Sequence, residues 1–222
     1  MSPDTPLEFS LVPTPIGTFR IVYQGRSVQY VDLLERGLPA SPVPEAAVSR
    51  RPPFPPESPP RQLQEYFQGR RDSFDLDTDP GTLSTFDRAV YRELLKVPKG
   101  RTVTYGQLAR RSGHLGAARA VGGAMHRNPI PIIIPCHRVV GETGTLQGFG
   151  LGLWRKRWLL DWEGAWPLRS KTPEGPRDPH QRTLEVDARD PDTVVLAVRN
   201  PRASRKGPSD RRRTKAASTQ PE

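Results

Sequence analysis

Cysteine is nearly absent from this sequence, because Cys136 is the only one among 222 residues. A single cysteine excludes an internal disulfide and a zinc site built from several thiolates. The uses that remain are a nucleophile, a redox-active thiol and a small buried core residue. The sequence therefore predicts neither a metal site nor a cofactor.

Long apolar segments are also lacking. No apolar run approaches the roughly 18 residues that are needed to span a bilayer. The first ten residues do not show the basic region and apolar core of a secretion signal. The sequence thus predicts a cytoplasmic protein with no membrane role, in a reducing compartment that keeps the thiol of Cys136 free.

Acidic residues are outnumbered by basic ones. The chain has 34 Lys and Arg against 24 Asp and Glu, which gives a formal net charge of +10 and a pI near 10.3. Such an excess attracts polyanions, and nucleic acid is the usual partner. Residues 202–215, with three consecutive arginines, are open to two interpretations: a solvated tail or a non-specific phosphate contact.

The amino-terminal part, residues 1–80, is expected to be a small β-containing structural domain. Apolar stretches at residues 19–23 and 27–31, separated by Gln-Gly-Arg, predict a hairpin. Residues 39–60 are dense in proline and are expected to be a loop without regular structure. A short helix is expected at residues 61–67, whose apolar side chains share one face.

The next part, residues 81–168, is expected to be mostly helical. Apolar residues at helical spacing follow the cap residue Ser84 and end before Pro98. Thr104 and Gln107 form a capping-box pair that starts a second helix, and a third spans about residues 117–126. Two short helices joined by a glycine-containing turn predict a helix-turn-helix, whose second helix faces DNA.

The last predicted helix carries Trp154, Trp158 and Trp162 at four-residue spacing. Core packing and stacking on bases are the two interpretations of this stripe. Residues 169–222 are rich in charge and proline and are expected to be a disordered basic tail, although residues 192–198 fit a strand. The fold class is therefore α+β: a β-containing domain, a helix-turn-helix domain of winged-helix type, and a tail.

Cys136 stands in a context that points to chemistry. Three isoleucines at residues 132–134 predict a buried strand or extended segment that Pro135 ends, which places the thiol on a rigid turn at the edge of the core. His137 follows at once, so an imidazole is available to activate the thiol. For Arg138, a phosphate contact and a salt bridge at the core edge both remain open.

An ordered set of motifs extends from residue 86 to residue 164. It consists of TYGQLA at 104–109, ARAVGGAM at 118–125, Asn128-Pro129, IPCHRVVG at 134–141, Trp158-Leu159-Leu160 and Glu163-Gly164. This set resembles the O6-alkylguanine-DNA alkyltransferase family. The resemblance implies repair of double-stranded DNA by transfer of an alkyl group from O6 of guanine to Cys136, with O4-alkylthymine as a second candidate substrate. It also implies a monomer that reacts once.

The same resemblance assigns catalytic roles. It implies that Glu163 holds His137 and that His137, through a water molecule, takes the proton of Cys136 as general base. Tyr105 matches the residue that donates a proton or hydrogen bond to the departing guanine. Asn128 matches the asparagine whose side chain fixes the shape of the turn around the cysteine.

Further assignments concern DNA. The resemblance implies that Arg119 fills the space of a nucleotide rotated out of the duplex, and that small residues on the same helix, with Tyr105, face the minor groove. These small residues are Ala118, Ala120 and Gly122. The pocket for the base is expected to include Val139, Phe149 and Gly150, and the main-chain carbonyls of residues 136 and 139 are expected to bind the guanine amino group.

Other classes of protein remain as alternatives. A non-catalytic protein that binds damaged DNA would share the helix-turn-helix, and so would a transcription regulator. A regulator, however, needs polar base-reading side chains where this chain has Ala and Gly. A cysteine hydrolase also uses Cys and His, but these are normally distant in sequence.

Overall fold

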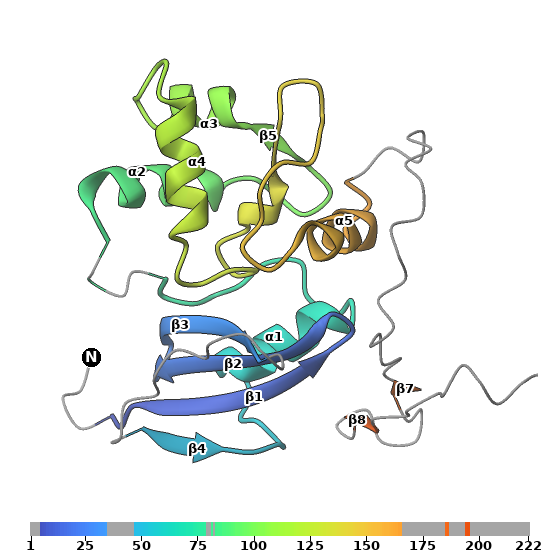
Figure 1. Ribbon diagram of the computed structural model, residues 1–222. Coiled ribbons are helices and arrows are strands. Elements are labelled where there is room, and N and C mark those ends of the chain that lie inside the picture. The colour runs from blue at the N-terminus through green and yellow to red at the C-terminus, as the bar shows by residue number, and fades with distance from the viewer. Residues whose placement is uncertain are drawn as a thin grey trace, which may run out of the picture.

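The computed structural model describes residues 5–34, 47–78, 81 and 83–165, and the backbone of two short strands beyond them. A sheet with one helix forms the amino-terminal part, and a group of helices lies above it (Figure 1). This arrangement agrees with the predicted α+β class. No helix within these residues is long and apolar enough to cross a membrane.

The amino-terminal sheet has the order β3-β2-β1-β4. Strands β1 (Glu8–Thr14), β2 (Gly17–Gln24) and β3 (Ser27–Leu34) pair in antiparallel fashion, so the predicted hairpin is confirmed. Phe19, Ile21 and Val31 contribute to its buried face. The β2–β3 turn contains a glycine at φ 59°, a conformation that other residues rarely adopt.

The proline-dense segment differs from the expectation of irregular structure. It contains β4 (Val48–Arg50), which pairs in parallel with β1, and the first two residues of α1 (Pro59–Phe67). Residues 47–51 lack proline, so their N–H groups can enter a sheet, and Val48 donates to the carbonyl of Leu7 at 2.8 Å. Proline is also tolerated in the first turn of a helix, where no N–H partner is needed.

Helix α1 covers one face of the sheet. Leu63, Tyr66 and Phe67 are buried beneath it, and the ring of Phe67 stacks on Phe19 at a centroid distance of 6.1 Å. On its other side Phe67 meets Trp158 at 6.2 Å. The short helix thus packs against both parts of the molecule, and the buried aromatic rings join them into a continuous core.

The helical part begins with α2 (Thr85–Leu94), α3 (Tyr105–Arg111) and α4 (Ala118–His126). Ser84 caps α2 by accepting from the backbone of Asp87, and Thr104 and Gln107 form the complete capping box of α3. These predicted starts are confirmed. The chain passes from α3 to α4 through a short turn, as expected for a helix-turn-helix.

The isoleucine run is a buried turn instead of a strand. Residues 131 and 134 bridge each other, and Ile132 has φ 75°, an unusual conformation for a β-branched residue. Asn128 stabilises the turn, because its side chain accepts from the N–H of Ile130 and donates to the carbonyl of Ile134.

A single turn of 3-10 helix, Cys136–Arg138, follows the isoleucine turn. It leads into β6 (Val139–Val140), which pairs in parallel with β5 (Val103–Thr104).

Helix α5 (Leu153–Trp162) carries the tryptophan stripe. Trp158 and Trp162 stack at 5.6 Å, and Trp158 also contacts Phe67, so this pair packs on the α1 side of the molecule. Farther along the chain, the backbones of β7 (Glu185–Val186) and β8 (Val194–Val195) pair with each other. This pairing agrees with part of the strand considered at residues 192–198. The prediction of a disordered tail otherwise lies outside the described residues.

Candidate active site

Cys136 is the first residue of the 3-10 turn that follows the isoleucine run. The side chain is 4% exposed, and its Sγ is 3.1 Å from Nδ2 of Asn128. The same nitrogen donates to the carbonyl of Ile134 at 2.9 Å. Asn128 therefore fixes the turn, as the resemblance of the motifs implied, and also contacts the sulfur directly.

His137 and Glu163 form a buried pair. Nε2 of His137 is 2.9 Å from Oε1 of Glu163, and neither side chain is exposed to solvent. Nδ1 of His137 is buried and has no hydrogen-bond partner among the described residues. If Glu163 is ionised, Nε2 must carry the proton that it donates, and Nδ1 is then free to accept one.

Arg138 belongs to the same cluster. Its Nε lies 2.9 Å from Oε2 of Glu163, its Nη2 lies 2.7 Å from Oε1, and its Nη1 donates to the carbonyl of Val97. The side chain is 7% exposed, so it is enclosed in this ion pair and does not reach a phosphate. Of the two interpretations left open by the sequence, the structure supports the salt bridge.

The ionisation of the three groups follows from burial and from their partners. Burial raises the pKa of the Cys136 thiol, and the hydrogen bond from Asn128 only partly opposes it. Burial lowers the pKa of His137, against the effect of Glu163. Burial alone would raise the pKa of Glu163, but the hydrogen bonds and charge of His137 and Arg138 hold it well below its usual range. At neutral pH the site thus holds a thiol, a neutral imidazole and a carboxylate.

An open cavity of about 660 Å³ lies beside the sulfur. Cys136 forms part of its wall, so the thiol is buried against the protein but faces a space large enough for a small ligand. The other lining residues come from α3, α4 and the loop before α5; they are Tyr105, Ala118, Arg119, Gly122, Met125, His126, Gln147, Gly148, Phe149 and Gly150. Most of the residues predicted to bind DNA or the base therefore meet at one cavity.

Two of the residues predicted to bind DNA or the base do not line this cavity. Val139 is fully buried and pairs with Val103 in the short parallel sheet, so its side chain contributes to the core. Its place in the base pocket was expected through its main-chain carbonyl, which does not depend on the side chain, and it stays a prediction. Ala120 is exposed on α4, one residue beyond Arg119, and lies on the outer surface instead of in the cavity.

Tyr105 and Lys156 lie close together and contact the same carbonyl on the loop before α5. The hydroxyl of Tyr105 contacts the carbonyl of Gln147 at 3.4 Å, and the same carbonyl accepts from Nζ of Lys156 at 2.7 Å. Burial lowers the pKa of Lys156 to about 8, and the ionised form of Cys136 acts in the opposite direction. Lys156 thereby holds the loop that forms one wall of the cavity.

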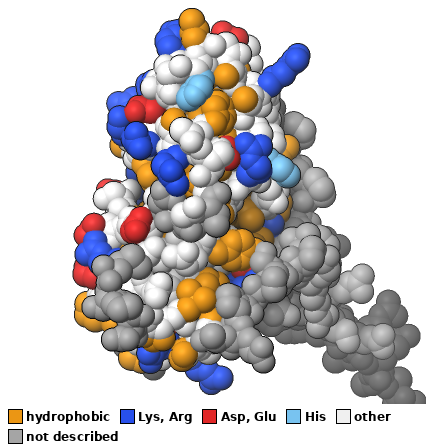
Figure 2. Space-filling view, turned by 90° about the vertical axis from the view of Figure 1, so that its left-hand side faces the viewer, with side chains coloured by type: hydrophobic (Ala, Val, Ile, Leu, Met, Phe, Trp, Pro, Cys, Tyr) orange, Lys and Arg blue, Asp and Glu red, His pale blue; other side chains and the backbone are white. Residues whose placement is uncertain are grey.

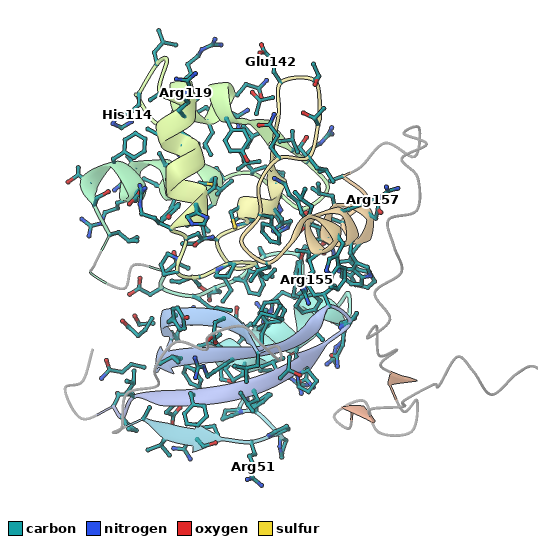
Figure 3. The ribbon with its side chains drawn as sticks, viewed as in Figure 1. Arg51, His114, Arg119, Glu142, Arg155 and Arg157 are labelled. Carbon is teal, nitrogen blue, oxygen red and sulfur yellow. The ribbon has the colours of Figure 1, made fainter. Side chains whose placement is uncertain are left out.

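The outer surface around α4 is basic. Figure 3 shows Arg119 at the upper end of α4 beside His114, pointing away from the sheet, and Glu142 on the loop that rises next to it. Figure 2 shows Lys and Arg side chains over the upper, helical half of one face. Between Glu93 and Glu142 the sequence has no acidic residue and, besides the buried Arg138, seven Lys and Arg residues: Lys96, Lys99, Arg101, Arg110, Arg111, Arg119 and Arg127.

Sequence reasoning missed Lys156 and Tyr66. Lys156 has the spacing of a buried helix face, because it lies three residues before Leu159 and seven before Glu163. This spacing could have predicted that the lysine side chain is buried. Tyr66 donates to Oε1 of Glu163 at 2.6 Å. The two residues are 97 positions apart in the sequence, so no local pattern predicts this contact.

Among the described residues, no group of three or more His, Cys, Asp or Glu side chains is placed to hold a metal ion. Glu163 is bonded to protein donors on both of its oxygens.

Comparisons with known proteins agree with this geometry. A family profile described as "6-O-methylguanine DNA methyltransferase, DNA binding domain" matches residues 85–165. The methylated-DNA–protein-cysteine methyltransferase of Methanosarcina acetivorans is 39% identical over 158 residues, which are 71% of this chain and 98% of that protein.

Two crystal structures extend the comparison to the fold. That of Mycobacterium tuberculosis O6-methylguanine methyltransferase is 35% identical, with a TM-score of 0.61, and the match covers 73% of this chain and 96% of the other. A structure of Mycobacterium tuberculosis OGT in complex with DNA is also 35% identical, with a TM-score of 0.60, and covers 71% and 93%.

Proposed function

Because this chain belongs to the methylated-DNA–protein-cysteine methyltransferase family, we propose that it repairs DNA by moving an alkyl group from O6 of guanine to Sγ of Cys136. One observation carries the proposal above all. The single thiol of the chain faces an open cavity. The adjacent imidazole is held by a carboxylate through one nitrogen, and its other nitrogen has no partner within the described part of the chain. This is the arrangement that a nucleophile and its general base require.

The reaction is a displacement at carbon. The bond between the alkyl carbon and O6 breaks while a bond between that carbon and Sγ forms. Since burial raises the pKa of the thiol, its proton must be removed for the sulfur to attack, and Nδ1 of His137 is the acceptor, through a bridging water. The proton finally resides on the released guanine, so the products are a thioether and an unmodified base.

Departure of the guanine needs a donor, because a bare anion is a poor leaving group. Tyr105 lines the cavity, and its hydroxyl makes a long contact of 3.4 Å with the carbonyl of Gln147. It is thus available to turn toward the purine ring. Phe149 supplies an apolar wall for the base on the same cavity.

The base has to leave the duplex before it can react. Extrusion costs a few kcal/mol of stacking and pairing, and a side chain that fills the vacated space offsets part of this cost. Arg119 is exposed at the rim of the cavity and points outward from α4 (Figure 3). The small side chains on this helix surface belong to Ala118, Ala120 and Gly122. They allow the helix to approach a minor groove closely, and they make no sequence-specific contacts with base edges.

Among the described residues, the site contains no second group that would regenerate the thiol. A thioether is stable in water, so each chain acts once and is then spent. The proposed partner is double-stranded DNA with an alkylated guanine, bound by a monomer. A cytoplasmic location is inferred because a reducing compartment keeps the thiol of Cys136 free.

The decisive experiment uses a duplex that contains one O6-methylguanine with a radiolabelled methyl group. We expect transfer of at most one label per protein chain and recovery of the label on the peptide that contains Cys136. Cys136→Ala should take up no label but retain binding, because the helix-turn-helix does not depend on the sulfur. Binding without transfer in the wild-type chain would instead support a non-catalytic damage-binding protein, and preference for one undamaged sequence would support a regulator.

A further inference from the structure

The hydroxyl of Tyr66 connects the amino-terminal domain to the carboxylate beside the reactive turn. It donates to Oε1 of Glu163 at 2.6 Å, and both side chains are buried. The same oxygen lies 2.9 Å from Nε2 of His137 and 2.7 Å from Nη2 of Arg138. One carboxylate oxygen thus receives donors from two separate parts of the fold.

These donors differ in how they are held. His137 and Arg138 are neighbours on the single 3-10 turn, so they move with that turn. Tyr66 is the one donor to Glu163, within the described residues, that comes from outside it. Its ring is fixed on α1 by Phe67 at 5.1 Å and Phe74 at 5.3 Å. The packing of the amino-terminal domain therefore sets the position of the hydroxyl.

The amino-terminal domain contacts α5 at a second point. Nε of Arg155, near the start of α5, donates to the carbonyl of Ile16 in the β1–β2 turn at 2.8 Å. Figure 3 shows Arg155 between α5 and the sheet. Glu163 is the residue that caps the other end of the same helix. The domain thus holds both ends of the helix that carries the carboxylate.

We propose that Tyr66 is a positioning residue for alkyl transfer, through which the amino-terminal domain fixes Glu163 against His137. This inference rests on the function proposed above. A carboxylate that accepts three donors stays ionised and leaves the proton on Nε2 of His137, so that Nδ1 can accept the proton of the thiol. Without the hydroxyl, the carboxylate loses the donor that comes from outside the turn, the imidazole is oriented less firmly, and the thiol of Cys136 ionises at a higher pH.

The test compares Tyr66→Phe with Tyr23→Phe. Both changes remove one buried hydroxyl from the amino-terminal domain and keep the ring, but Tyr23 bonds to Ser10, in the sheet, at 3.2 Å. Methyl transfer from the duplex is measured from pH 6 to 9. The rate of alkylation by iodoacetamide is measured over the same range, and it reports on Cys136 alone because the chain has no other cysteine.

For Tyr66→Phe we expect about a tenfold slower transfer at neutral pH, the size of one hydrogen bond to a charged group. The deficit should shrink as the pH rises, and the iodoacetamide profile should move to higher pH. Tyr23→Phe should follow the wild type. A Tyr66→Phe chain that matches Tyr23→Phe at every pH, or one whose loss is the same at every pH, would overturn the inference. Absence of transfer in the wild type would instead contradict the proposed function.

Discussion

Nδ2 of Asn128 lies 3.1 Å from Sγ of Cys136, and the other end of the same amide accepts from the N–H of Ile130. One side chain therefore shapes the turn and donates to the sulfur. A donor at this distance stabilises a thiolate more than a thiol, and it opposes the burial that raises the pKa of Cys136.

Asn128→Asp should test the contact with the sulfur. The carboxylate can still accept from Ile130, but it loses the donor to the carbonyl of Ile134 and offers the sulfur a negative charge in place of a donor. We expect the apparent pKa of Cys136 to rise and transfer at neutral pH to slow by at least about tenfold. The pH dependence of alkylation by iodoacetamide measures the change. An unchanged profile would mean that the amide acts on the turn alone.

His137→Ala should remove the general base. Such a base typically contributes about 10²- to 10⁴-fold to a rate. We expect a loss in this range at neutral pH and partial recovery toward higher pH, where the thiol ionises without help. Single-turnover rates from pH 6 to 9 provide the measurement. Wild-type rates in this variant would assign the activation of the thiol to another group.

Glu163→Gln should destabilise the protein by about 3 kcal/mol at neutral pH, because it leaves the buried Arg138 without its counter-charge. The folded pKa of Glu163 is depressed, so its ionised form contributes stability above the unfolded pKa of about 4.3. That contribution is lost as the pH falls through and below this value. Urea unfolding at pH 7 and pH 4 should therefore show a difference between variant and wild type that narrows in acid.

Arg119→Ala should slow alkyl transfer from a duplex more than alkyl transfer from a free base. Reaction with the free base O6-methylguanine needs no extrusion, so its rate should be retained, while the saturating rate with a duplex should fall by about tenfold or more. Arg110→Ala is the matched control, since it removes one exposed charge from α3 without lining the cavity. It should weaken duplex binding in low salt but leave the saturating rate unchanged. Equal losses on both substrates would point to a structural role for Arg119.

Several features were determined by sequence alone. Two helices start where predicted: α2 at the cap Ser84, and α3 at the capping box of Thr104 and Gln107. A cap can be read from sequence because its hydrogen bonds join residues only three positions apart. The hairpin of β2 and β3 follows in the same way from a short turn between apolar stretches. The adjacency of Cys136 and His137 already indicated the chemistry, since a reactive thiol needs a nearby base.

Other features were decided only by the tertiary structure. The residues 132–134 read as a strand from their composition, but they form a turn that Asn128 holds and the core encloses. Arg138 had two open roles until Glu163, 25 residues away, was placed against it. The hydroxyl of Tyr66 reaches that carboxylate across 97 residues. Local hydrogen bonds and periodicity span a few residues and can be read from sequence, whereas the partners of a buried charge depend on how distant elements pack.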